Sequence, residues 1–366
     1  MNERRMPLTR RTFLQYAGIT AAAAACAPAT VAAPSSAPVP TAGTVPAGAA
    51  SAAPSSTAIG PAEKTKLAVG IRLPSLNSQA PVLIARDKGY FKDAGFSIVE
   101  LVISQEQSAG ITSGSLDFGL LPPGDVAAAA MKGVPQRIIG AFRNYTTISI
   151  AVRPEIASAK ELDGKDVLLG GVPGTKDFDR RVKLLKAAGW DLTTVKPNYV
   201  TVAGGSDAWV KLFLDKKLFM TPIFTRHRKP IAESGSKLLV DTDVYGNDVW
   251  TTTQSFVDKN PNTTAQFLVA YLKGLQIWKD LAQKDYVMAV GEKAGIKITQ
   301  EVIDAYESDV YNYHAKGSVF DGGYTLDELR QYLVDFDLKI ELKDLILTTQ
   351  LNRAQRALNF APRPVL

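Results

Sequence analysis

Residues 81–96 read PVLIARDKGYFKDAGF, and this stretch decides the fold of the surrounding chain. Its apolar half continues a helical pattern that starts at Ala80, and Gly89 is typical of the residue that ends a helix. The β-rich runs on either side, Lys66–Ile71 and Phe96–Ile103, predict strands. A strand, a short helix and a second strand in this order favour an α/β fold with a parallel sheet.

The same alternation continues to about residue 245 and falls into two blocks. In the first block we expect strands at 117–121, 137–141 and 148–152 and a helix at 123–132. In the second block we expect strands at 166–169, 199–202, 218–223 and 237–240, with helices at 175–188 and from Ser206. After about Tyr245 the pattern turns helical, and Asn260 before Pro261 is typical of a helix N-terminus. Two α/β lobes are predicted, with the late helices packing on the first.

The first 25 residues have the three parts of an export signal: a basic head, a short apolar core and small residues before a cut. Arg10-Arg11 followed by Phe13-Leu14 resembles the twin-arginine export motif, with Gln15 where Lys is usual. The apolar stretch is too short for a membrane-spanning helix, which needs about 20 apolar residues. The sequence therefore predicts a protein that is exported.

Cys26 is the only cysteine of the chain and follows three alanines at the end of this signal. Ala23-Ala24-Ala25-Cys26 resembles a bacterial lipobox, although its first position is usually Leu. The resemblance implies lipid attachment at Cys26. The alternative is a plain signal-peptidase cut that leaves the cysteine without a role.

The residues after Cys26 are almost wholly Ala, Pro, Ser, Thr, Val and Gly up to about residue 62. Such a segment buries too little apolar surface to offset its ordering entropy, so we expect a disordered stalk. The predicted organisation is an export signal at 1–25, the lipidated cysteine and stalk at 26–63, the first part of lobe 1 at 64–147, lobe 2 at 148–245, and a return to lobe 1 with C-terminal helices at 246–366.

The charge balance argues against a nucleic-acid-binding protein. The chain has 42 basic and 36 acidic residues, a net charge of +6, and four arginines and one glutamate of this total lie in residues 1–26. The remainder carries about +3 and shows no dense basic face. The short cluster Arg226–Lys229 is predicted to be a solvated loop.

Residue patterns for chemistry or cofactor binding are missing. The glycine-rich run Gly170–Lys176 lacks the Gly-Lys-Ser/Thr of a phosphate-binding loop. The two histidines, His227 and His314, are far apart, and no Cys/His/carboxylate set has the spacing of a metal site. We therefore expect no catalytic residues, no metal and no cofactor.

Four segments in the right order resemble one family. They are residues 81–96, Ser113–Gly119, Glu161–Val167 with Gly171–Thr175, and Asn260–Pro261 with Phe267-Leu268. The family comprises the substrate-binding proteins of ABC importers for nitrate, taurine, alkanesulfonates and thiamine-pyrimidine precursors, and some members bind riboflavin. The resemblance covers roughly residues 66–280. It implies a two-lobed periplasmic-binding-protein fold of the type II, Venus-flytrap kind, and as partners a small-molecule ligand, a membrane permease and its ATPase subunit.

Ligands of such sheets lie beyond the carboxyl ends of the strands, where the helices begin. The predicted ligand-binding residues at these positions are Asn77, Gln79, Ser104, Pro122, Asn144, Tyr145, Gly174, Thr175, Ser206, Thr221, Phe224 and Tyr245. Aromatic side chains are also expected near this rim at Phe178 and Trp250, and cations at Arg72, Arg143 and Lys176. The alternatives are that the aromatics belong to the core and that Thr175, Ser206, Asp125 and Asp207 only cap their own helices.

Hydroxyls, amides and aromatic faces suit a flat heterocycle better than a small anion. We expect a heteroaromatic vitamin or precursor, with riboflavin as first choice and the thiamine pyrimidine as second. An alkanesulfonate, taurine or nitrate is the alternative ligand. The lobes are expected to close by a hinge near residues 145–150 and 243–250.

Two interpretations from other classes stay open. Pyrimidine synthases share the fold, but their cysteine-rich motif is missing here. A structural surface lipoprotein without a ligand would show no closure. The favoured interpretation is a lipid-anchored importer subunit on the outer face of the cytoplasmic membrane.

Overall fold

The computed structural model describes residues 58–72, 75–104, 106–142, 145–203, 205–245, 248–315, 321–323, 326–335 and 337–362. The predicted export signal, Cys26 and the stalk up to residue 57 lie outside these residues. No described helix is both long and apolar enough to cross a membrane.

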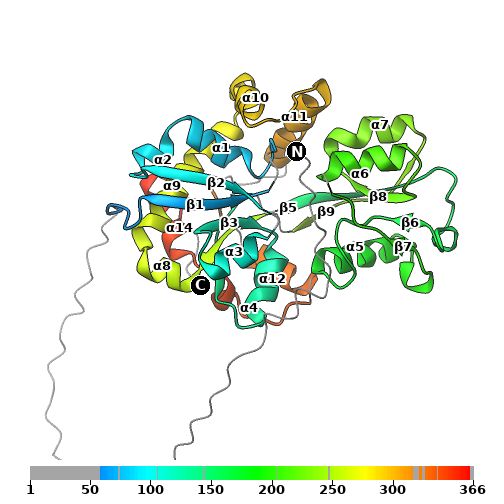
Figure 1. The fold of residues 1–366 in the computed structure, drawn as a ribbon, viewed down its shortest axis with the longest axis horizontal. Coiled ribbons are helices and arrows are strands. Elements are labelled where there is room, and N and C mark those ends of the chain that lie inside the picture. Colours follow the sequence, from blue (N-terminus) through cyan, green and yellow to red (C-terminus); the bar gives the residue numbers. More distant parts are fainter. Residues whose placement is uncertain are drawn as a thin grey trace, which may run out of the picture. The chain divides into compact units, whose positions relative to one another are not determined.

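Two five-stranded sheets form the framework of the described chain (Figure 1). The first sheet has the order β2 (Ile98–Ile103), β1 (Lys66–Ile71), β3 (Phe118–Leu121), β10 (Val249–Thr253) and β4 (Gln136–Ala141). The second has the order β7 (Asn198–Tyr199), β6 (Asp166–Val167), β8 (Met220–Ile223), β5 (Tyr145–Val152) and β9 (Lys237–Tyr245). Strands β1, β2 and β3 are parallel, as are β6, β7 and β8, whereas β10 and β5 run antiparallel to their neighbours. We call each sheet with its helices a lobe, and this is the predicted two-lobed α/β fold.

Most helices belong to the first lobe. They are α1 (Ala80–Asp87), α2 (Tyr90–Asp93), α3 (Gln107–Ser113), α4 (Pro123–Met131), α8 (Gln254–Lys259), α9 (Pro261–Trp278), η4 (Leu281–Gln283), α10 (Lys284–Lys293), α11 (Gln300–Ala315), α12 (Leu326–Asp335), α13 (Leu342–Leu345) and α14 (Thr349–Ala357). The second lobe has η1 (Ala159–Leu162), α5 (Lys176–Ala187), η2 (Leu192–Thr194), α6 (Gly205–Leu214), η3 (Thr225–His227) and α7 (Arg228–Glu233). Figure 1 shows α6 and α7 on one face of the second sheet and α5 on the other.

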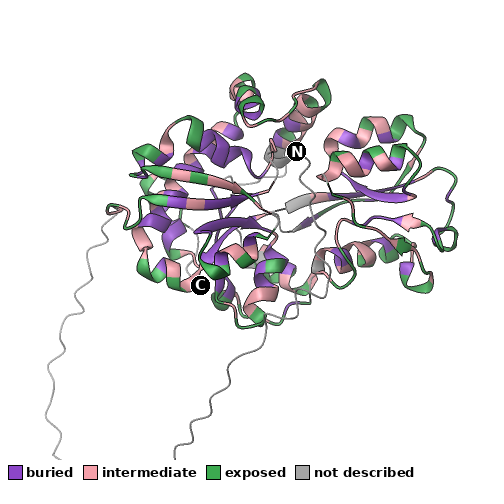
Figure 2. Ribbon diagram, viewed as in Figure 1, coloured by how far each residue is buried: buried purple, intermediate pink, exposed green. Residues whose placement is uncertain are grey.

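Strands β1, β3, β10 and β4 of the first sheet are mostly buried, whereas the edge strand β2 is largely exposed or half-buried (Figure 2). Leu67, Val69 and Ile71 of β1 pack into a core with α1 and α9, and Ala68 between them faces a second core with α4 and α12. This alternation follows from the period of two along a strand. The late helices α9, α10, α11 and α14 add to the first core, as the sequence predicts.

The predicted element order is largely confirmed, with one strand missed. Gly89 ends α1 in the left-handed conformation, at a φ of 75°. Val249–Thr253, which lies in a region expected to be helical, forms β10 between β3 and β4 in the first sheet. Val, Trp and Thr favour strands, so the local signal was present. The predicted strands 166–169 and 199–202 are shorter in the structure, with ladder pairing only at β6 and β7.

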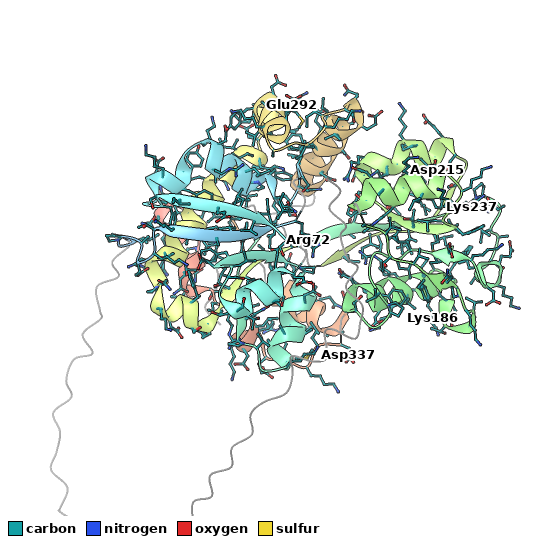
Figure 3. All side chains as sticks on the ribbon, viewed as in Figure 1. Arg72, Lys186, Asp215, Lys237, Glu292 and Asp337 are labelled. Atoms are coloured by element: carbon teal, nitrogen blue, oxygen red, sulfur yellow. The ribbon has the colours of Figure 1, made fainter. Side chains whose placement is uncertain are left out.

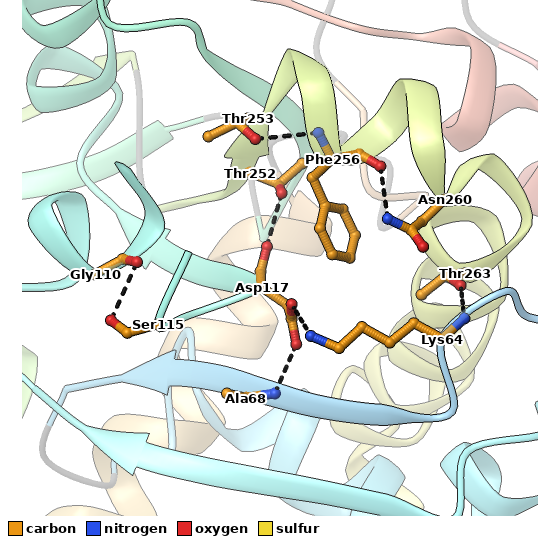
Figure 4. A network of polar contacts seen from close by, with 10 residues as sticks. All are labelled: Lys64, Ala68, Gly110, Ser115, Asp117, Thr252, Thr253, Phe256, Asn260 and Thr263. Atoms are coloured by element: carbon orange, nitrogen blue, oxygen red, sulfur yellow. Dashed lines mark hydrogen bonds and ion pairs between the residues drawn. The ribbon is translucent and has the colours of Figure 1, made fainter. Parts of the chain in front are cut away.

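Asp117, directly before β3, is bonded to β1 through its buried carboxylate and to β10 through its backbone carbonyl oxygen (Figure 4). Its Oδ2 accepts from the backbone N–H of Ala68 at 2.9 Å, and its Oδ1 accepts from Lys64 Nζ at 2.5 Å. The hydroxyl of Thr252 donates to the Asp117 carbonyl oxygen at 2.7 Å. Asp117 is only 4 % exposed, and these protein donors take the place of water at its carboxylate.

Helix α9 is capped from outside its own sequence. Asn260 is the N-cap residue and Pro261 the first helical residue, as predicted, but the Asn260 side chain makes no capping hydrogen bond. Instead the Glu63 carboxylate accepts from the backbone N–H groups of Asn262 at 3.0 Å and Thr263 at 2.7 Å. Burial alone would raise the Glu63 pKa, and these N–H donors lower it below its ordinary value.

Candidate functional site

The carboxyl ends of strands from both sheets are brought together where the lobes meet. Helix α4 follows β3 in the first lobe, α5 follows β6 in the second, and these two helices are in contact. Asp248, just before β10, lies beside Pro122 because β10 pairs antiparallel with β3 in the register Val249 to Leu121. Arg72 follows β1 at the end of the first sheet that points toward the second (Figure 3). This is the region in which the sequence predicts the ligand.

Three predicted residues of the first lobe make contacts with protein groups. Asn77 donates to Asp309 of α11 at 3.1 Å. The Ser104 hydroxyl accepts from the Glu106 backbone N–H at 3.0 Å and so stabilises its own loop. Pro122 is the N-cap residue of α4, and its carbonyl oxygen accepts from the Asp125 backbone N–H at 3.0 Å.

Gln79 differs from these residues because part of its side chain is unsatisfied. It is the N-cap residue of α1 and is 4 % exposed. Its Oε1 is buried and accepts no hydrogen bond from the described residues. A buried acceptor without a donor is costly, so this oxygen is suited to a bound water or to a ligand donor.

In the second lobe, three of the predicted residues lie at helix starts. Gly174 is exposed with a φ of 87°. Thr175 is the N-cap residue of α5, but its hydroxyl donates to the Val172 carbonyl oxygen at 2.9 Å rather than capping the helix. The Ser206 hydroxyl accepts from Arg226 at 2.7 Å. The first N–H groups of α5 therefore have no side-chain cap and can meet an oxygen-rich ligand.

The remaining predictions have different outcomes. Thr221 is 0 % exposed inside β8, and its hydroxyl donates to the Pro222 carbonyl oxygen at 3.3 Å. Phe224, directly after β8, is 39 % exposed. Tyr145 and Tyr245 pair with each other in the β5–β9 ladder, and their side chains are not among those described. Asn144 lies outside the described residues. As ligand contacts, these residues stay predictions.

Two aromatic residues expected near the rim belong to the cores instead. Trp250 is 0 % exposed and packs edge-on against Tyr271 at a centroid distance of 5.3 Å. Phe178 is 6 % exposed and packs edge-on against Tyr199 at 4.8 Å. For both, the alternative of a core role is right, because β10 and α5 turn these side chains into the lobe interiors.

Arg181 is a cation of this region that the sequence did not single out. Its Nη1 donates to the carbonyl oxygens of Gly170 at 3.4 Å and Asp177 at 3.3 Å, and both bonds are long. Its Nε is buried and has no partner among the described residues. Burial lowers the Arg181 pKa and the Asp177 carboxylate raises it, with burial the stronger effect. A guanidinium held this weakly retains capacity for an oxygen acceptor. Of the expected cations, Arg143 and the Lys176 side chain lie outside what is described.

The acidic side of the region is centred on Asp125, in the first turn of α4. Its pKa is raised, first because neighbouring protein displaces water from the carboxyl group and second because of the Asp177 carboxylate of the other lobe. Asp248 raises it further, whereas Arg72 lowers it. The pKa of Asp125 therefore depends on carboxylates of both lobes and on Arg72.

The basic cluster 226–229 is not a solvated loop, which corrects the prediction. His227 is buried, and its Nε2 lies 2.7 Å from Asp207 Oδ1, while its Nδ1 accepts from the Phe224 backbone N–H at 3.1 Å. Arg226 also bonds Asp207, and Arg228 bonds Asp241. Asp207 therefore joins η3 to α6 instead of only capping its own helix, and the imidazole fixes the backbone that carries Phe224.

We expect the second lobe to lose stability when the pH falls below about 7. Burial lowers the His227 pKa below its ordinary value of about 6.5, so the unfolded chain takes up this proton first. The hydrogen bond from His227 also lowers the pKa of Asp207, and that contribution is lost at still lower pH. Thermal unfolding of the whole chain between pH 8 and 5 measures the decline. In His227→Gln the decline should be smaller, and in His314→Gln, the chain's other histidine, it should be unchanged. Identical pH profiles for wild type and His227→Gln would contradict this role.

A hollow of about 780 Å³ lies elsewhere in the first lobe. It is lined by residues 130–131, 133–135, 137, 338–341 and 344 and contains none of the predicted ligand residues. Among the described residues, no group of three or more His, Cys, Asp or Glu side chains is placed to hold a metal ion.

Solved structures with the same fold are numerous. A protein of Bordetella bronchiseptica RB50 is 18% identical over 81% of this chain and 99% of its own, with a TM-score of 0.65. The sulfonate ABC transporter's periplasmic sulfonate-binding protein SsuA from Methylobacillus flagellatus KT is 13% identical over 81% and 96%, with a TM-score of 0.58. A cysteine-to-serine mutant of DSZB in complex with biphenyl-2-sulfinic acid is 13% identical over 80% and 100%, with a TM-score of 0.54. DSZB is described as a desulfurization enzyme. These likenesses show the two-lobed fold.

A search of curated proteins finds no significant match. The sequence model of one family, described as NMT1/THI5 like, matches residues 77–281, which is more than half of the chain. The match spans both lobes and includes most of the strand ends described above. The chain belongs to the NMT1/THI5-like family.

Proposed function

We propose that this chain is the substrate-binding lipoprotein of an ABC importer. It captures a small molecule between its lobes and delivers it to a membrane permease that is driven by a separate ATPase subunit. Lipid on Cys26 anchors it to the outer face of the cytoplasmic membrane after twin-arginine export. Family membership supports the importer role, as does the likeness to a structure named as a sulfonate-binding protein of an ABC transporter.

One observation carries the proposal: a helix that follows a strand of the first sheet meets a helix that follows a strand of the second. Helix α4 after β3 contacts α5 after β6, and α11 of the first lobe contacts η3 directly after β8. Ligands of open α/β sheets lie beyond the carboxyl ends of the strands, at helix N-termini. Here both sheets present such positions to the same region, which suits a ligand held by two lobes.

The chemistry of this region favours a ligand with a flat apolar body. Phe224, Val172 and Ile103 follow or end strands of the two sheets, and they are 39 %, 48 % and 56 % exposed. Large apolar side chains at the carboxyl ends of strands can pack against a ring system. The Gln79 oxygen and the uncapped N–H groups of α5 add polar positions for a heterocycle. Riboflavin is the first choice, and the thiamine pyrimidine precursor is the second.

A second candidate ligand class is favoured by Arg181. Within the described part of the chain, the Arg181 guanidinium makes two long hydrogen bonds and its Nε has no partner, which suits an anionic oxygen. An alkanesulfonate, taurine or nitrate would use the Arg181 guanidinium, together with Arg72.

Binding without chemistry remains our proposal, although the likeness to DSZB shows that enzymes also use this fold.

Gentle purification followed by native mass spectrometry tests the ligand assignment. We expect a yellow, fluorescent preparation that carries one flavin and becomes more compact in X-ray scattering than its ligand-free form. Phe224→Ala should weaken riboflavin binding about tenfold, since stacking on an aromatic ring contributes about 1–3 kcal/mol.

Leu214→Ala is the matched control, because Leu214 is similarly exposed, at 36 %. It is the last residue of α6 and lies away from the carboxyl ends of the strands. Its affinity for riboflavin should equal that of the wild type. A colourless preparation that is stabilised by an alkanesulfonate and not by riboflavin would replace the first assignment with the second.

A further inference from the structure

Asp309 of α11 joins the two lobes through a single carboxylate. Its Oδ2 accepts from Asn77 Nδ2 at 3.1 Å, and its Oδ1 accepts from Thr225 Oγ1 at 2.9 Å. Asn77 lies between β1 and α1 in the first lobe, and Thr225 begins η3, two residues after β8 ends in the second. One side chain therefore contacts the segments that follow a strand in each sheet.

Helix α11 is fixed to the first lobe on both sides of Asp309. The Tyr306 hydroxyl donates to the Trp278 carbonyl oxygen at 2.5 Å, and Glu307 pairs with Lys284 at 2.6 Å. Val310 is 0 % exposed in the first core. Asp309 therefore moves with the first lobe, and its bond to Thr225 must break when the lobes separate.

The loop that carries Asn77 is also held within the first lobe. Trp278 Nε1 donates to the Leu76 carbonyl oxygen at 2.6 Å, and the Ser78 hydroxyl donates to Asp248 at 2.8 Å. On the opposite side, Thr225 adjoins Phe224, whose backbone N–H donates to His227. The Asp309 contacts thus flank predicted ligand residues of both lobes.

We propose that Asp309 is a positioning residue, an interlobe latch that holds the second lobe through Thr225 in the arrangement where the predicted ligand residues face each other. The inference rests on the proposed function, because a ligand that needs both lobes gains affinity when they are held together. A hydrogen bond that forms only when the lobes are latched lowers the free energy of the latched arrangement relative to the separated arrangement. A hydrogen bond to a charged group corresponds to about a tenfold change in such a population ratio.

The test measures the distance between the lobes without any ligand. Spin labels are attached to cysteines introduced by Lys217→Cys in the second lobe and Glu292→Cys in the first, both at exposed positions. The full chain also carries Cys26→Ser, so that no other thiol is present. Thr225→Val removes the hydroxyl and keeps the side-chain shape. We expect it to increase the ratio of separated to latched molecules about tenfold, Asp309→Ala to do the same, and the double variant to add nothing.

Glu307→Gln is the control, since it breaks an ion pair of the same helix inside the first lobe. It should leave the distance distribution unchanged. If Thr225→Val also leaves the distribution unchanged, or if Glu307→Gln changes it equally, the latch is wrong. If Asp309→Ala does not fold, Thr225→Val still decides.

A binding measurement separates the latch from the proposed function. In Thr225→Val, the Kd for riboflavin should rise by the factor by which the latched fraction of the molecules falls. If riboflavin does not bind the parent chain, the ligand assignment is wrong, whereas the distance measurement still decides the latch.

Discussion

Gly274→Ala should lower the free energy of unfolding by about 3 kcal/mol, because α1 and α9 cross without room for a side chain. An alanine Cβ at this position would lie 2.1 Å from the Pro81 carbonyl oxygen and 3.0 Å from the carbonyl carbon. A backbone oxygen cannot rotate away, so α1 has to shift as a whole. The gain in helix propensity of up to about 1 kcal/mol does not offset this clash. Urea unfolding followed by tryptophan fluorescence measures the loss.

Gly291→Ala is the matched control in α10. There the new Cβ would lie 2.6 Å from a terminal methyl carbon of Leu76, which can rotate. We expect its free energy of unfolding to stay within about 1 kcal/mol of the wild-type value. Equal destabilisation by the two substitutions would show that the crossing of α1 and α9 is not the cause. Because Pro81 closely follows Asn77–Gln79, Gly274→Ala should also weaken ligand binding.

Asp117→Ala should cost about 3 kcal/mol, mainly through hydrogen bonds rather than through the ion pair. The substitution leaves the Ala68 backbone N–H without its acceptor at the edge of the core. A donor left unpaired in this way costs about 1–3 kcal/mol, and the lost packing of a residue that is 4 % exposed adds to it. Lys64 is 44% exposed, so after the substitution its ammonium returns to water and loses little.

Asp117→Asn and Lys64→Met separate these contributions. Asparagine keeps an oxygen for the Ala68 N–H, so its cost should be about 1 kcal/mol. Lys64→Met removes only the exposed ion pair and should change stability by less than about 1 kcal/mol. Amide hydrogen exchange at Ala68 should speed up in Asp117→Ala and hardly change in Lys64→Met. If Lys64→Met is as destabilising as Asp117→Ala, the ion pair matters more than the hydrogen bond.

Local patterns predicted the elements wherever the signal is contained in a few neighbouring residues. The run that ends at Gly89 became α1, and Asn260-Pro261 became the start of α9. The strand at Val249–Thr253 was missed although its residues favour a strand, because nothing near it predicts that the chain returns to the first sheet between β3 and β4. That return places Asp248 beside Pro122 and Trp250 in the core.

The rule that ligands lie beyond strand ends led to Asn77, Thr175 and Phe224, and the structure places all three in segments that follow strands. As ligand contacts they stay predictions. The rule could not lead to Arg181, which comes one turn after Asp177 in α5, nor to Asp309, 232 residues after Asn77. Helical spacing identifies a buried apolar face, but it does not show which polar side chain meets a segment that is distant in the sequence.

The sequence by itself determined the family, the two-lobed α/β fold and the order of most elements, because periodicity, helix caps and glycine stops are local properties. Its export signal, Cys26 and stalk stay predictions. Only the tertiary structure decided how charges and hydrogen bonds are paired. Glu63 caps a helix about 200 residues away, Asp207 holds His227, and Asp309 joins the lobes. These pairs depend on which strand ends and helix ends become neighbours in space, and that follows from packing the whole chain.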